Sequence, residues 1–405
     1  MDIKNIKKDF PIFKEQINGK PLVYLDSANS SQKPKVVIDR ISHFYETEFS
    51  NVGRSVHTLA VKATNSFEAT RDKVQKYLNA NHREEIIFTK GATEAINLVA
   101  SSYGKKYINK GDEILITELE HHSNYVPWNF LRTEKGAVIK FAQVNENGDV
   151  ELDEIKKLIT SKTKIIAITH ISNVTGAVLP ITKIVDLAKE KKIPVLIDGT
   201  QGAPHSEIDM QKIGCDFYAI SCHKMYGPNG LGLLYMKKKW VDDLPPYQGG
   251  GGMINEVKKD EISFADAHTK FEAGTMQTAE VVAFAESLNF IEKLGIKNIT
   301  SHENEILQYG LETLKKNNSV NIIGDPKERG SVLCFTLKDI HPHDIATILD
   351  DDGVAIRAGH HCCQILHDKL GIPATARASI GVYNDKEDID KLSDAIKNCQ
   401  KVFQN

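Results

Sequence analysis

The sequence predicts an α/β protein with two domains: a large one built on a mainly parallel sheet covered by helices, and a smaller α+β one. At 405 residues the chain exceeds what one hydrophobic core usually serves. From Glu85 onward, short and almost wholly apolar segments alternate with helical segments, which is typical of parallel strands buried on both faces. The pattern changes near residue 290. We therefore expect a large domain at residues 21–290 and a small domain at 291–405, with residues 1–20 as its N-terminal arm.

The elements are justified in chain order by their apolar spacing. Before the alternation we expect one short strand and two amphipathic helices, at residues 22–25, 35–49 and 59–78. Apolar runs predict the strands of the large sheet at 86–89, 113–117, 137–142, 164–169, 194–198 and 217–221. Helical segments lie between them, for example 92–103, 152–159 and 181–191. An irregular stretch and a bridging helix follow, at 248–275 and 280–294. The small domain has predicted strands at 332–337, 354–357 and 378–383, and helices at 343–349 and 387–403.

The composition is that of an ordinary soluble globular protein, with 41% hydrophobic and 26% charged residues. A net charge of -3, with lysines dispersed among acidic residues, gives no electrostatic reason to bind nucleic acid or an anionic membrane. No apolar run is long enough to span a bilayer, and residues 1–10 lack the apolar region of a signal peptide. The six cysteines have no regular spacing, so we expect a reducing, cytoplasmic compartment.

Polar side chains stand where predicted strands end, the edge at which parallel sheets bind ligands. Ala92 and Thr93 open a helix after one strand. Helix N–H groups beside a hydroxyl suit a phosphate, although helix capping explains Thr93 equally well. Asp198 ends another strand, with Gln201 three residues later. A buried carboxylate needs a cationic partner such as a protonated pyridine nitrogen; capping of a turn is the alternative. Asn173 follows a third strand end.

Lys224 lies in the stretch around which the chain is organised, residues 217–230. Ser221 and His223 are two residues apart, so on an extended backbone they face the same side. Lys224 follows them where the strand opens into a dense turn signal. Between apolar runs an amine is partly desolvated, which leaves it nucleophilic and able to form a Schiff base with an aldehyde cofactor. This stretch alone is also compatible with an exposed lysine at a strand end.

Two segments combine histidine with possible reactive groups. His121 and His122 follow a strand end, where a neutral imidazole can stack on an aromatic ring or move a proton; a metal site is the alternative. Cys362 follows two histidines, with Arg357 close in sequence, and cationic neighbours favour a thiolate. Gly359 makes this loop flexible, which suits a thiolate that attacks one site and delivers to another. A metal-binding cluster and inert turn cysteines are the alternatives.

Arginines and a histidine outside these segments are further candidates. Arg377 begins a predicted strand among small residues and has no acid beside it in the sequence. A substrate carboxylate held by two hydrogen bonds is then a natural partner, and a surface position is the alternative. The loop 51–57 contains glycine and two cations with potential function, Arg54 and His57.

Together these residues resemble the pyridoxal 5'-phosphate (PLP) enzymes of fold type I in the class V aminotransferase group, and within it the Suf-type (group II) cysteine desulfurases. The resemblance runs nearly end to end. The matching stretches are 24–28, 51–59, 89–94, 120–124, 170–173, 198–201, 221–227, 271–275 and 357–362.

The resemblance implies a role for each candidate. Lys224 carries the Schiff base and moves protons, His121 stacks on the cofactor ring, and Cys362 accepts the sulfur. Asp198 pairs with the ring nitrogen and Gln201 bonds the ring hydroxyl. The phosphate is held by the residues Ala92, Thr93, Ser221 and His223, and by Thr275 of a neighbouring subunit, which implies a homodimer. The substrate is held by Asn173, Arg357 and Arg377.

The implied activity converts L-cysteine to L-alanine and leaves a persulfide on Cys362. A sulfur-acceptor protein of the Suf system then takes the sulfur for iron–sulfur cluster assembly. Selenocysteine lyase and cysteine sulfinate desulfinase are related alternatives, and a simple transaminase would leave Cys362 without a role. A metal-carrying assembly module using residues 360–363 is the alternative from a different class.

Five positions depart from the usual pattern of the family. Cys222 stands where a small residue is usual, and Cys363 where alanine is common. Cys363 could trap the persulfide as a disulfide or do nothing. Gly53 replaces a usual histidine, and residues 276–277 replace a usual Pro-Asn pair. These departures bear on rate and loop order rather than on the class of reaction.

Overall fold

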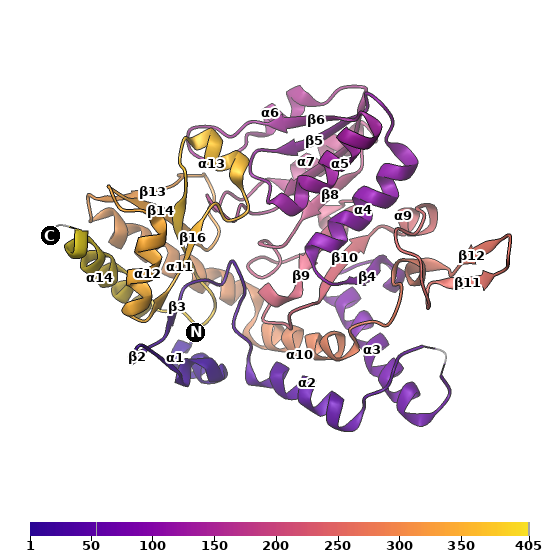
Figure 1. The fold of residues 1–405 in the computed structure, drawn as a ribbon, viewed down its shortest axis with the longest axis horizontal. Helices are drawn as coiled ribbons and strands as arrows, with labels where there is room; N and C mark the ends of the chain where they lie inside the picture. Colours follow the sequence, from indigo (N-terminus) through magenta and orange to yellow (C-terminus); the bar gives the residue numbers. More distant parts are fainter. Residues whose placement is uncertain (54, 404–405) are drawn as a thin grey trace.

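A seven-stranded sheet forms the centre of the structure, a computed structural model that describes residues 1–53 and 55–403 (Figure 1). Its strands, in spatial order, are β4 (Ile86–Thr89), β10 (Gly232–Met236), β9 (Phe217–Ser221), β8 (Val195–Asp198), β7 (Thr163–Thr169), β5 (Glu113–Thr117) and β6 (Val138–Ala142). Strand β10 runs antiparallel to both neighbours, and the other neighbouring pairs are parallel. The predicted mainly parallel sheet is confirmed.

Helices cover both faces of this sheet because alternate residues of each strand point to opposite sides. On β5, Leu115 belongs to one hydrophobic cluster, and Ile114 and Ile116 belong to another. The first cluster is completed by α3 (Thr58–Tyr77), α7 (Ile181–Glu190) and α10 (Thr278–Leu294). The second is completed by α4 (Ala92–Tyr107), α5 (Val126–Lys135) and α9 (Lys238–Asp243). The near-continuous apolar strands predicted from the sequence therefore reflect burial on both sides.

A second, antiparallel sheet lies toward the C-terminus, at the left of Figure 1. Its strands are β13 (Val320–Ile322), β14 (Val332–Leu337), β17 (Thr375–Ser379) and β16 (Arg357–Gly359). Its hydrophobic cluster includes residues of α11 (Ile296–Lys315), α12 (Pro342–Asp351) and α14 (Lys386–Phe403). Near the N-terminus, β3 (Val23–Tyr24) pairs in parallel with β15 (Val354–Ala355). The domain division at residue 290 stays a prediction, and the β3–β15 pair joins residues 23–24 to the C-terminal part.

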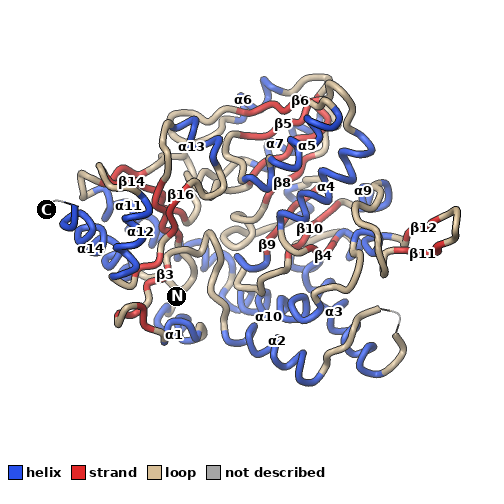
Figure 2. Tube along the Cα trace, viewed as in Figure 1, coloured by secondary structure: helices blue, strands red, loops and turns tan. Residues whose placement is uncertain are grey.

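The remaining elements are short or peripheral, and Figure 2 shows one hairpin projecting from the body. The helices are α1 (Ile3–Lys8), α2 (Lys35–Thr47), α6 (Leu152–Leu158), α8 (Met210–Ile213) and α13 (Gln364–Leu370). The hairpins are β1 (Gln16–Ile17) with β2 (Lys20–Pro21), and the projecting β11 (Ile254–Val257) with β12 (Ile262–Phe264). The 3-10 helices are η1 (Pro11–Lys14), η2 (Arg83–Glu85), η3 (His122–Asn124), η4 (Cys222–Lys224) and η5 (Ala267–Phe271). None of the described helices is both long and apolar enough to cross a membrane.

Three sequence-based assignments need correction. The single strand expected at 354–357 is wrong, because β15 and β16 belong to different sheets. The strand expected at 378–383 is also wrong. Strand β17 occupies 375–379, where small side chains fit between β14 and β16. Finally, the stretch expected to be irregular contains the β11–β12 hairpin. The first two outcomes depend on which distant strand is available for pairing, whereas the two strands of the hairpin pair only with each other.

Candidate active site

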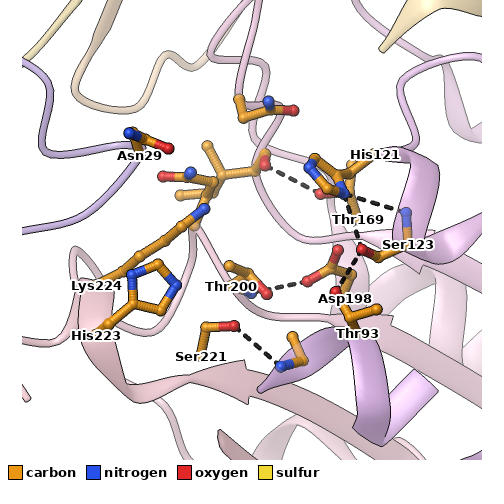
Figure 3. A pocket seen from close by; sticks show the side chains of 14 residues that line it. Asn29, Thr93, His121, Ser123, Thr169, Asp198, Thr200, Ser221, His223 and Lys224 are labelled. Atoms are coloured by element: carbon orange, nitrogen blue, oxygen red, sulfur yellow. Dashed lines mark hydrogen bonds between the residues drawn. The ribbon is translucent and has the colours of Figure 1, made fainter. Parts of the chain in front are cut away.

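A cavity of about 180 Å³ lies at the carboxyl ends of the large-sheet strands (Figure 3). Nine residues predicted for the site line it: Ala92, Thr93, His121, Asn173, Asp198, Gln201, Ser221, His223 and Lys224. They stand at the ends of different strands or in the segments that follow them. The sheet thereby brings together residues far apart in the chain, such as Ala92 and Ser221, which are 129 positions apart and hydrogen-bonded. Four predicted residues are not among those that line the cavity: Thr275, Arg357, Cys362 and Arg377.

Lys224 ends the 3-10 helix η4, which follows β9 directly. The pKa of the Lys224 amine is lowered to about 8, mainly by burial and also by the nearby Arg377 guanidinium, while the Asp198 carboxylate acts in the opposite direction. About a tenth of the amine is therefore unprotonated at pH 7, and about half of it near pH 8. Cys222, two residues earlier, is fully buried, and burial raises the pKa of its thiol well above the usual range. Cys222 is accordingly an inert packing residue here.

The turn that carries Lys224 is held by the segment before α2. The carbonyl oxygen of His223 accepts hydrogen bonds from Ser31 Oγ at 3.0 Å and from Lys33 Nζ at 2.7 Å. Ser31 Oγ also accepts a bond from the backbone N–H of Tyr226 at 2.8 Å. Tyr226 has a φ of 61°, a left-handed conformation that is unfavourable for a residue with a Cβ. These contacts over a long sequence separation fix the direction in which Lys224 leaves the turn.

Asp198 is a buried carboxylate without a cationic partner within ion-pair distance among the described residues. Its Oδ1 accepts the backbone N–H of Thr200 at 3.0 Å. Thr200 Oγ1 is itself buried without a hydrogen-bond partner in the described part of the chain. Gln201 faces the same cavity, and its Nε2 donates to the Ala28 carbonyl at 2.7 Å. A ligand with a cationic ring nitrogen would satisfy Asp198, because a buried charge requires a partner.

The part of the cavity at the start of α4 has the character of an anion site. Helix α4 begins at Ala92, whose N–H donates to Ser221 Oγ at 2.9 Å. Thr93 Oγ1 lies 2.7 Å from Ser123 Oγ, so two hydroxyls accompany the helix N-terminus. Burial and the neighbouring Lys224 lower the pKa of His223 to about 4, which keeps this imidazole neutral and able to donate one hydrogen bond. Such a set of neutral donors suits a phosphate.

His121 presents a neutral imidazole to the cavity. Its Nδ1 accepts the backbone N–H of Ser123 at 3.1 Å, and burial lowers its pKa to about 4. Directly before it, Glu120 is buried and accepts bonds from Asn124 Nδ2 at 2.6 Å and from the Thr169 N–H at 3.0 Å. Burial raises the pKa of Glu120 to about 8. Sequence reasoning missed Glu120 as the residue that holds this turn, although an acidic residue next to a histidine pair was a visible signal.

Arg377 lies in the middle of β17 and is buried, with an exposed fraction of 2%. Its Nη1 donates to the Asn173 carbonyl at 3.1 Å, and its Nη2 lies 3.3 Å from Asp26 Oδ1. Arg377 has no acid beside it in the sequence, as noted above, but Asp26 reaches it from the N-terminal segment. Its Nε is buried without a partner among the described residues and remains available to a ligand. Arg357 is the directly opposed residue on β16.

Cys362 is half-buried in a loop between β16 and α13. Its carbonyl accepts the His122 N–H at 2.7 Å, and the carbonyl of His361 accepts Asn173 Nδ2 at 2.8 Å. The loop is thus anchored to His122 and to Asn173, which lines the cavity. Burial and Arg377 lower the pKa of His361 to about 2, so the expectation that this histidine supplies positive charge to the thiolate is wrong.

Two predicted features lie elsewhere. Thr275 is exposed and away from the cavity of its own chain. In the loop 51–57, Arg54 lies outside the described residues, and His57 Nδ1 accepts the Ala60 N–H at 3.3 Å at the start of α3.

Within residues 1–53 and 55–403, no group of three or more histidine, cysteine or acidic side chains is arranged to hold a metal ion.

The fold and the cavity define a class of α/β enzyme in which a buried amine, an unpaired carboxylate and a phosphate-type site converge beyond the ends of a mainly parallel sheet. The chain belongs to the aminotransferase class-V family, whose model matches residues 23–392.

The sequence relatives and the solved structural neighbours described next all carry the name cysteine desulfurase. A probable cysteine desulfurase of Halalkalibacterium halodurans is 44% identical over 403 residues, covering 100% of this chain and 99% of that protein. One from Staphylococcus epidermidis is 46% identical, covering 99% and 98%. The crystal structure of the cysteine desulfurase CsdA from Escherichia coli aligns with a TM-score of 0.92 at 34% identity, covering 99% of each chain. The apo cysteine desulfurase of Thermococcus onnurineus aligns with a TM-score of 0.93 at 33% identity, covering 98% of each.

Proposed function

We propose that this chain is a PLP-dependent cysteine desulfurase of the Suf type, which converts L-cysteine to L-alanine and keeps the sulfur as a persulfide on Cys362. One observation carries the proposal. The buried amine of Lys224 lines the cavity, and the Cys362 loop is hydrogen-bonded through His361 to Asn173, which lines the same cavity. A nucleophilic amine and a half-buried thiol therefore serve one site from two distant parts of the chain.

The residues present fit the cofactor. Lys224 would hold its aldehyde carbon covalently, and the unpaired Asp198 carboxylate would face its ring nitrogen. Neutral His121 would lie against the ring, with Gln201 near the ring hydroxyl. The phosphate would be held by the α4 N-terminus and the side chains of Thr93, Ser221 and His223. When bound, PLP supplies the electron sink for the reaction.

The protein groups then divide the remaining work. Arg377 and Asn173 are positioned to hold the substrate carboxylate, with Arg357 beside them. Lys224 Nζ, with its pKa lowered to about 8, takes the α-proton of the substrate and returns a proton later. The Cys362 thiolate attacks the substrate sulfur, so that the Sγ–S bond forms as the Cβ–S bond breaks. The electron pair of the broken bond stays with the carbon fragment, which is protonated to give alanine.

We further propose a cytoplasmic homodimer that delivers sulfur to an acceptor protein. Exposed Thr275 would reach the phosphate of the partner subunit. Large apolar side chains exposed on and beside α2 and at the start of α3 support a covered face: Val36, Ile38, Tyr45, Phe49, Leu59 and Val61. Sedimentation of the full chain at micromolar concentration tests the dimer, and a monomer would contradict it.

The Cys362→Ala variant tests the activity. It should form no persulfide from cysteine, while borohydride reduction followed by peptide mass spectrometry still finds the cofactor on Lys224. A matched control is Cys399→Ala, which removes a buried thiol from the C-terminal hydrophobic cluster and should keep alanine production. Persulfide formation at the native rate in Cys362→Ala would exclude Cys362 as the acceptor, and an adduct on another lysine would exclude Lys224.

A further inference from the structure

Cys363 directly follows the proposed sulfur acceptor but lies in a different environment. Its exposed fraction is 1%, whereas Cys362 is half-buried. Burial raises the pKa of the Cys363 thiol, and the neighbouring Glu120 raises it further. The thiolate is the nucleophilic form of cysteine, so Cys363 is unreactive at neutral pH. A buried thiol of this kind is unsuited to trapping a persulfide as a disulfide.

Asn173 determines what the Cys363 thiol does instead. Nδ2 of Asn173 donates to the carbonyl oxygen of His361 at 2.8 Å, and a carbonyl oxygen can only accept. This contact sets the orientation of the amide, and its Oδ1 consequently faces Cys363 Sγ at 3.0 Å. Because Oδ1 is also only an acceptor, the thiol must be the donor. The Cys363 proton thus satisfies Oδ1 of the Asn173 side chain, while the second N–H of Nδ2 is left for the substrate carboxylate.

The backbone held by this amide is strained. His361 has a φ of 52° and Cys362 a φ of 58°, two consecutive left-handed residues that both carry a Cβ. Such a conformation persists only where its surroundings hold it. Here the Asn173 amide holds the His361 carbonyl, and the His122 N–H holds the Cys362 carbonyl at 2.7 Å. The direction in which Cys362 presents its Sγ therefore depends on both contacts.

We propose that Cys363 is a positioning residue for sulfur transfer, whose thiol donates to Asn173 and thereby keeps the His361–Cys362 backbone in its strained conformation. The backbone carbonyl of Asn173 accepts from Arg377 Nη1 at 3.1 Å, so the same residue also joins the loop to the proposed substrate arginine. The effect on transfer rests on the proposed function, but the effect on the Cys362 loop does not. Alanine at 363 would lack the donor, and serine would retain one.

The loop effect is measured by thiol labelling of the full-length, cofactor-loaded protein without substrate. A short pulse of iodoacetamide followed by peptide mass spectrometry should label Cys362 and spare Cys363. In Cys363→Ala the loosened loop should raise the Cys362 labelling rate about threefold or more, as expected for the loss of one hydrogen bond. Cys363→Ser should bring the rate back close to that of the native protein, and the Cys399→Ala control should leave it unchanged.

Sulfur transfer is measured in parallel as alanine formation. Cys363→Ala should lower kcat about three- to tenfold while KM for cysteine stays within about twofold, and Cys363→Ser should restore kcat. Native labelling of Cys363 as fast as that of Cys362, a persulfide found on Cys363, or identical alanine and serine variants would each overturn the proposal. If the native protein forms no alanine at all, the proposed function fails, and the labelling comparison alone decides the role of Cys363.

Discussion

The buried ion pair between Arg71 on α3 and Glu272 gives a stability prediction that can be worked out from the structure. Arg71 is 0% exposed, and its Nη1 and Nη2 donate to the two Glu272 oxygens at 2.8 and 2.9 Å. Glu272 Oε1 also accepts the Phe88 N–H of β4 at 2.8 Å. Glu272→Ala leaves the guanidinium buried without this partner, which costs about 3–5 kcal/mol of unfolding free energy. Because Glu68 still accepts Arg71 Nε at 3.1 Å, we expect the lower end of that range.

Urea unfolding followed by circular dichroism measures this loss. The double variant Arg71→Met/Glu272→Leu leaves neither charge of the pair unpartnered. Its loss of unfolding free energy should therefore be at least about 1 kcal/mol smaller than the losses of Arg71→Met and Glu272→Leu added together. The exposed pair Lys327–Glu151 is the control, with side chains 76% and 49% exposed, and Glu151→Ala should cost below about 1 kcal/mol. A Glu272→Ala loss as small as that of Glu151→Ala, or strictly additive variants, would refute the reasoning.

Two further predictions concern the cofactor site. Lys224 is cationic below its pKa of about 8 and neutral above it, so the rate at which cofactor-free protein takes up PLP should rise as the pH increases through about 8; a flat rate from about pH 6 to 9 would contradict this. A Cβ at Gly232 would lie 2.4 Å from Gly91 Cα, beside the α4 N-terminus. Gly232→Ala should therefore weaken PLP binding by more than about tenfold in a fluorescence titration, whereas Gly249→Ala, with open space around it, should not. Equal affinities of these two variants would show that α4 is not displaced.

Most elements of the large sheet could be predicted because each depends on a short stretch of sequence. The predicted strands 113–117 and 217–221 coincide with β5 and β9, whose residues are all buried. The cavity residues could be anticipated for a related reason. In a mainly parallel sheet the strand ends meet at one edge, so the order of elements already places Asp198 and Lys224 near each other.

The contacts that the sequence did not predict join residues that lie far apart in the chain. Asp26 pairs with Arg377 across 351 positions, and Cys363 bonds Asn173 across 190. No local sequence pattern predicts such contacts. The neutral state of His361 was missed for the same reason, because its burial depends on the whole fold around it.

By itself, the sequence determined which chemical groups stand at the ends of the strands and which class of sheet carries them, since periodicity and strand order are properties of neighbouring residues. Only the tertiary structure decided which of those groups are charged, which are already paired and which remain free for a ligand. Desolvation and hydrogen bonding act between atoms in space, and the chain brings those atoms together only when it folds.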